Sequence, residues 1–136
     1  MPPLSKTLTL TSASRSSNPI PLCFINFSNS NLTNESVKSL SETLAKQLSL
    51  QNLHIDFTLY FSFIISFFIK NHDSCQNLTD PAISCLSSAL KNLVSLKNLD
   101  LNFDTCQQLS DASVQSISQN LDKLTSLQNF ALHFRE

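Results

Sequence analysis

The sequence predicts an α/β solenoid of about three β-α coils, with a parallel sheet on the concave side and helices on the convex side. Two observations predict it. The stretches LQNLHIDF, LKNLDLNF and LQNFALHF begin at Leu50, Leu96 and Leu127, and they share apolar residues at the first, fourth, sixth and eighth places. Each stretch follows a segment whose apolar residues have helical spacing. Such a unit exposes two apolar faces that only neighbouring coils can bury.

The second and third copies align without a gap at an offset of 31 residues. Residue 75 onward reads CQNLTDPAISCLSSALKNLVSLKNLDLNF, and residue 106 onward reads CQQLSDASVQSISQNLDKLTSLQNFALHF. The first copy, residues 31–57, precedes the second by 46 residues, and the excess of 15 equals the length of residues 58–72. Removing that stretch restores a regular array.

Each copy changes periodicity at its middle. Apolar residues at positions 83, 86, 90 and 93 are three, four and three apart, which is one face of an α-helix. Asp80 before Pro81 predicts a helix N-cap followed by proline at the first helical position, and we expect Asp111 and Asn34 to cap their own helices. Positions 99, 101 and 103 alternate with period two, as in a strand with one buried face. The half-copy LCFINF, residues 22–27, predicts one more strand.

These motifs resemble a known family. The pattern L-x-x-L-x-L at residues 96–101, followed by Cys106 and Leu109, resembles leucine-rich repeats of the ribonuclease-inhibitor-like or cysteine-containing type. The resemblance covers residues 31–57 and 73–134 and implies the fold, whereas proteins of this family serve many roles. The family places its Asn or Cys three residues after the last strand Leu, but Cys106 lies five after Leu101. The turn that leaves the strand is therefore longer.

The chain divides into four segments. Residues 1–18 are Ser-rich and predicted to be disordered, residues 19–57 hold the degenerate strand and the first repeat, residues 58–72 are an apolar insertion, and residues 73–134 hold the second and third repeats. The last strand is an open parallel edge, so we expect a fragment of a longer array or a marginally stable domain.

Residues 58–72, TLYFSFIISFFIKNH, form an apolar insertion with three interpretations. It could be a loop or helix that folds back on the repeats, a membrane-surface anchor, or a retained intron in the gene model. A bilayer span needs about 20 helical residues, and Lys70 is the only basic residue beside the apolar run, so the sequence argues against a membrane role. The retained intron is slightly favoured over the folded-back insertion.

Composition excludes several function classes. The chain has no glycine, so the glycine-rich phosphate loops and the G-x-S-x-G motif are absent. A net charge of −1 offers no field for nucleic acid. The four cysteines contain no C-x-x-C pair, and the N-terminus has no apolar signal region. We expect reduced thiols in a cytoplasmic protein, with Cys75 and Cys106 acting as small buried apolar residues in adjacent coils.

No catalytic or metal constellation is predicted. We expect His54 and His133 to occupy matching strand positions two coils apart, roughly 10 Å at the strand spacing, which is too far to share a metal. Asp56, Asp100 and Asp104 are expected to be solvated carboxylates. The sequence therefore indicates no enzyme and no cofactor.

The predicted function is a non-catalytic protein–protein interaction module that binds an unidentified protein partner on its concave face. The alternative is a purely structural repeat segment of a larger multidomain protein. Strand positions that alternate with the buried ones are predicted to contact the partner: Asn52, His54, Asp56, Asn98, Asp100, Asn102, Asn129 and His133.

Overall fold

The computed structural model describes residues 22–27, 32–57, 75, 77–104 and 106–134. Strands and helices alternate along these residues in the order β1, α1, β2, α2, β3, α3, β4. The strands are β1 (Leu22–Asn26), β2 (Asn52–Asp56), β3 (Asn98–Asn102) and β4 (Asn129–His133). The helices are α1 (Asn34–Leu44), α2 (Asp80–Leu90) and α3 (Asp111–Leu121).

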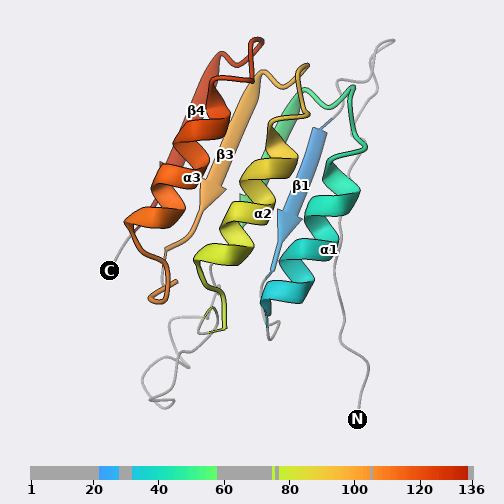
Figure 1. The fold of residues 1–136 in the computed structure, drawn as a ribbon. Helices are drawn as coiled ribbons and strands as arrows, with labels where there is room; N and C mark the ends of the chain where they lie inside the picture. Colours follow the sequence, from blue (N-terminus) through green and yellow to red (C-terminus); the bar gives the residue numbers. More distant parts are fainter. Residues whose placement is uncertain (1–21, 28–31, 58–74, 76, 105, 135–136) are drawn as a thin grey trace, which may run out of the picture.

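The four strands form one parallel sheet in the order of the sequence, and the three helices lie side by side on one of its faces (Figure 1). Each strand pairs with the next in the register that the repeat alignment requires: Leu53 lies beside Leu99, and Leu99 beside Phe130. The prediction of an α/β fold with stacked parallel strands is confirmed. The strand expected from the half-copy is β1, whose Leu22 pairs with Asn52.

The core lies between the sheet and the helices. The strand positions that alternate inward are buried in β2 and β3, and the helices contribute one stripe each, such as Val37, Leu40 and Leu44 of α1. Fully burying one such side chain stabilises the fold by about 1.5–3 kcal/mol. Because a coil supplies only one layer of this core, its stability depends on the coils beside it.

The helix starts differ from the prediction. Thr79 is the N-cap of α2, with φ −123° and ψ 168°, and Asp80 is already helical, so Pro81 follows one position later than expected. Thr33 and Ser110 hold the same position in α1 and α3, where their side chains accept from Ser36 N–H and Ala112 N–H, whereas the Thr79 side chain makes no capping hydrogen bond. The side chains of Asn34 and Asp80, which follow the first two of these caps, are instead engaged by the next coil.

That engagement links the helix starts of adjacent coils. The Asp80 carboxylate accepts hydrogen bonds from the Ser110 N–H at 2.9 Å, from the Ser110 hydroxyl at 2.7 Å, and from the Ser113 hydroxyl. Asn34 binds Thr79 equivalently: its Nδ2 donates to Thr79 Oγ1 at 2.9 Å, and its Oδ1 accepts from Thr79 N–H at 3.1 Å. These bonds hold each helix in register with the next.

Phenylalanines at the strand ends form a second link between coils. The rings of Phe27, Phe57, Phe103 and Phe134 stack in succession, with centroid separations of 5.2, 4.8 and 5.2 Å. Offset or stacked aromatic pairs contribute about 0.5–1.5 kcal/mol beyond their area burial. The stack therefore runs through all four strands of the sheet.

The last coil is less buried than its predecessors. Phe130 is 41% exposed, whereas Leu99, at the same position of β3, is 2% exposed. The repeat alignment predicts the same inward orientation for both. The difference arises because β4 is the last strand and has no described neighbour on its outer side.

Two predictions fall outside the described residues: the disordered segment 1–18 and the nature of the insertion 58–72. In the part of the chain that the structure describes, no helix has both the length and the apolar content to cross a bilayer.

Candidate interaction surface on the helix-free face

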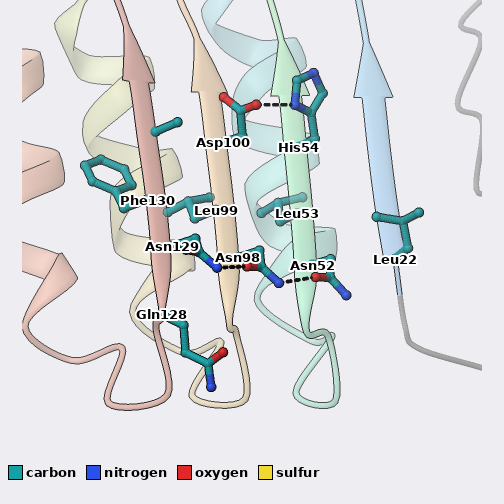
Figure 2. Close-up of a pocket in the computed structure, with 11 residues that line it drawn as sticks. Leu22, Asn52, Leu53, His54, Asn98, Leu99, Asp100, Gln128, Asn129 and Phe130 are labelled. Atoms are coloured by element: carbon teal, nitrogen blue, oxygen red, sulfur yellow. Dashed lines mark hydrogen bonds and ion pairs between the residues drawn. The ribbon is translucent and has the colours of Figure 1, made fainter.

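The sheet has one face that α1, α2 and α3 leave uncovered, and we call it the helix-free face. A shallow groove of about 620 Å³ crosses the strands on this side (Figure 2). The residues that line it are Leu22, Asn52, Leu53, His54, Asn98, Leu99, Asp100, Gln128, Asn129, Phe130 and Ala131. The groove therefore combines a polar floor with apolar residues from the two outer strands.

Asparagine side chains form a row across the first position of β2, β3 and β4. Asn129 Nδ2 donates to Asn98 Oδ1, and Asn98 Nδ2 donates to Asn52 Oδ1, as Figure 2 shows. The parallel register places these residues side by side, since Asn52 pairs with Asn98 and Asn98 with Asn129. An amide has two donor hydrogens and an acceptor oxygen. Each member therefore keeps hydrogen-bonding capacity beyond the row.

Asp100 lies between two histidines. His54 Nδ1 is 2.8 Å from Asp100 Oδ2, and His133 Nε2 is 3.4 Å from Asp100 Oδ1. The His54 ring also stacks on Phe24, with a centroid separation of 4.4 Å and an interplanar angle of 9°. The ring of His54 is thus held on one side by β1 and on the other by β3.

The two carboxylate oxygens of Asp100 differ in environment. Oδ2 has a short hydrogen bond to His54, whereas Oδ1 is buried and has no hydrogen-bond partner among the described residues. The 3.4 Å contact of Oδ1 with His133 is an electrostatic approach rather than a hydrogen bond, because its length and geometry fall outside the usual range. A buried acceptor of this kind is costly unless a donor approaches it.

The structure brings five of the eight predicted contact residues into the groove: Asn52, His54, Asn98, Asp100 and Asn129. The other three, Asp56, Asn102 and His133, belong to the row at the carboxyl ends of the strands and do not line it. The expectation that His54 and His133 occupy matching positions is wrong, because Asp100 and then Ala131 follow His54 across the sheet, whereas His133 pairs with Asn102. His133 is linked to the groove only through its contact with Asp100.

Asp56 requires a correction. It was expected to be a solvated carboxylate that meets a partner, but it is 2% exposed. Its neighbours at the same register position are Asn26 and Asn102. The alternation along β2 predicted the face that Asp56 occupies but not its burial. Asn102 also has a local role, since its Oδ1 accepts from the Asp104 N–H at 3.0 Å and shapes the turn that leaves β3.

Sequence reasoning missed the apolar flanks of the groove. Leu22 of β1 and Phe130 of β4 line the groove and are exposed, whereas Phe24 of β1 is exposed and stacks on His54 without lining it. The signal for Leu22 and Phe24 was present, because aligning the half-copy with the first repeat places Leu22 at the Asn52 position and Phe24 at the His54 position. The repeat alignment places Asp100 beside His54, but the side-chain orientations that bring its carboxylate between His54 and His133 come only from the structure.

The cysteines lie away from this face. Cys75 and Cys106 are buried, and the Cys75 thiol donates to the Phe57 carbonyl at 3.0 Å. A hydrogen bond between the two side chains, and then burial, raises the pKa of the Cys106 thiol far above its ordinary value. Thiols in this state pack as small apolar groups. Among the described residues, no cluster of three ligating side chains could hold a metal ion.

No protein-family model matches the chain, and no curated protein is significantly similar to it. The repeat pattern and the geometry of the helix-free face therefore carry the functional argument.

Proposed function

We propose that the chain is a leucine-rich-repeat module that binds a protein partner on its helix-free face, without catalysis. The supporting observation is the groove, in which aligned Asn, His and Asp side chains from three adjacent strands lie on a hydrogen-bonded sheet. A rigid surface loses little conformational entropy when it binds, so its polar contacts contribute more of their energy to affinity.

The chemistry of the groove fits an extended segment of a partner. The row from Asn52 to Asn129 offers amide donors and acceptors suited to a peptide backbone, and Leu22 and Phe130 offer apolar contacts at its two ends. The surface is therefore suited to a neutral or weakly basic strand-like segment, since Asp100 is its one acidic residue.

The His54–Asp100 pair does not lead us to propose an enzyme. A histidine held by a carboxylate at Nδ1 becomes a general base when Nε2 faces a hydroxyl or thiol nucleophile. Within the described residues, no hydrogen bond joins His54 to such a group. The pair is better explained as a device that orients the imidazole on the groove floor.

The test measures affinity for a purified partner. Proteins captured by the full chain are identified, and the dissociation constant of each is measured by calorimetry for the natural chain, Asp100→Ala and Asp122→Ala. Asp122 is exposed at the end of α3, on the helix side, so it provides a matched change of charge. We expect Asp100→Ala to weaken binding by about 10-fold or more, as for loss of a charged hydrogen-bonding group, and Asp122→Ala to leave it unchanged.

The alternative proposal is a purely structural repeat segment. It is supported if captured proteins bind both variants as tightly as the natural chain, provided far-UV circular dichroism shows all three chains folded. Equal loss in both variants would also contradict the helix-free face as the binding surface, because the effect would then follow from net charge alone.

A further inference from the structure

The outer side of the last coil is an apolar face that the preceding coils lack. Val114 is 38% exposed, whereas Ile83, its equivalent in α2, is fully buried. Leu109, Leu121, Leu127 and Leu132 are only partly buried, whereas their equivalents one coil earlier belong to the closed core. We call this surface, formed by α3, β4 and Phe134, the end face. It repeats the surface that coil α2–β3 presents to coil α3–β4.

Three series of contacts between coils reach the end face and stop there. The phenylalanine stack ends at Phe134, which is 41% exposed, whereas Phe103 is 1% exposed. The asparagine row ends at Asn129, whose Nδ2 donates back to β3. The backbone N–H of Phe57 donates to Asn102 O, and that of Phe103 to His133 O, both at 2.9 Å. Phe134 is the next equivalent residue, so its backbone N–H is the donor that would bond to the strand of a further coil.

The helix starts provide a fourth series. Asn34 contacts Thr79, and Asp80 contacts Ser110 and Ser113. Asp111 is the third member, and it has no partner among the described residues. Its carboxylate lies at the start of α3, as that of Asp80 lies at the start of α2, where it accepts from the Ser110 N–H and hydroxyl. The Asp111 carboxylate is therefore placed to accept from the Ser or Thr N-cap of a next helix.

We propose that the end face is a docking surface for one further β-α coil, entering in parallel register and carrying a Ser or Thr helix N-cap, a strand-start Asn and a strand-end Phe. Each requirement comes from a separate series: the N-cap meets Asp111, the Asn donates to Asn129 Oδ1, and the Phe stacks on Phe134. The coil would also bury Val114 and Phe130, as the existing interfaces bury Ile83 and Leu99.

A second copy of this chain is a poorer occupant. Its β1 strand would have to meet β4, but β1 carries Leu22 where the series needs Asn. Nor does any described helix precede β1 to bring an N-cap to Asp111. An antiparallel β4–β4 pairing would meet neither the asparagine row nor the phenylalanine stack in register.

The experiment extends the full chain with a copy of residues 104–134 inserted after Phe134, so that a matching coil follows directly. Hydrogen exchange followed by NMR compares two amides in each chain, those of Phe103 and Phe134. In the natural chain we expect the Phe134 amide to exchange faster than the Phe103 amide. In the extended chain we expect both to be equally protected. An inserted coil that leaves the Phe134 amide as fast as before would overturn the proposal.

Asp111→Ala provides the side-chain test. In the natural chain this substitution should lower the melting temperature less than Asp80→Ala does, because Asp111 has no described hydrogen-bond partner and interacts only with the dipole of its own helix. In the extended chain it should lower the melting temperature as much as Asp80→Ala does, which is the interior control. An equal effect of Asp111→Ala in both chains would contradict the role of Asp111.

Sedimentation of the natural chain over a range of concentrations tests whether a second copy of the chain occupies the end face. Monomers support docking of a separate coil. A dimer that Val114→Lys dissociates would identify a second copy as the occupant and overturn the proposal as stated. A dimer that this substitution leaves intact uses another surface, and the exchange result then decides alone.

Discussion

Replacing Phe103 by alanine should destabilise the chain far more than the same change at Phe134, although the two residues are equivalent in the repeat. Phe103 is almost fully buried and stacks on two rings, Phe57 at 4.8 Å and Phe134 at 5.2 Å. Truncating a buried phenylalanine costs about 3–5 kcal/mol. Phe134 stacks on one ring and is 41% exposed. Scaling the burial of a phenylalanine side chain, about 1.5–3 kcal/mol, by its buried fraction gives about 1–2 kcal/mol.

Urea unfolding followed by circular dichroism measures both values. With a slope of about 1.5 kcal/mol per molar urea, Phe134→Ala should lower the midpoint by about 1 M, and Phe103→Ala by two to three times as much. Phe103→Leu keeps most of the side-chain volume and serves if the alanine variant does not fold. Equal shifts for the two alanine variants at an unchanged slope would refute the reasoning, because they would mean that the last coil is packed as tightly as the interior.

Two further predictions concern titratable groups. Hydrogen bonds from the Ser110 backbone N–H, and then from the Ser113 and Ser110 hydroxyls, lower the pKa of the Asp80 carboxyl below its ordinary value of 3.8. The ionised carboxylate therefore stabilises the fold above pH 3.8. This contribution is lost as the pH falls through the lowered pKa. Asp80→Asn should therefore lower the free energy of unfolding at pH 7, with the gap closing under acid, and a gap that stays constant from pH 7 to pH 2 would contradict the linkage. Cys85 is the one exposed cysteine, whereas a hydrogen bond with the Cys75 side chain, and then burial, raises the pKa of the Cys106 thiol. A thiol reagent should label one cysteine rapidly in the native chain and four in denaturant, and rapid native labelling of Cys106 would contradict its burial.

The sequence predicted the candidate surface in part. The alternation of Asn98 and Asp100 with buried leucines identified which residues face away from the core, and the structure places both in the groove. The same rule included Asp56, which is buried. Alternation reports only which side of a sheet a residue occupies. The exposure of that residue also depends on the side chains beside it on the neighbouring strands, and the pairing of the strands determines which residues those are.

The helix starts show a similar division. The pattern at residues 80–81 placed the beginning of α2 to within one position, because Asp and Pro both favour a helix N-terminus. It did not show that Asp80 lies inside the helix and that its carboxylate accepts from the Ser110 N–H, 30 residues away in the chain.

By itself, the sequence determined the number of repeating units, the order of strands and helices, and the inward side of each strand, because periodicity is a local property and a constant offset demands equivalent stacking. Only the tertiary structure decided that Asp100 contacts His54 and His133 and that Asp56 is buried. These features depend on distances between side chains far apart in the chain, which no single repeat encodes.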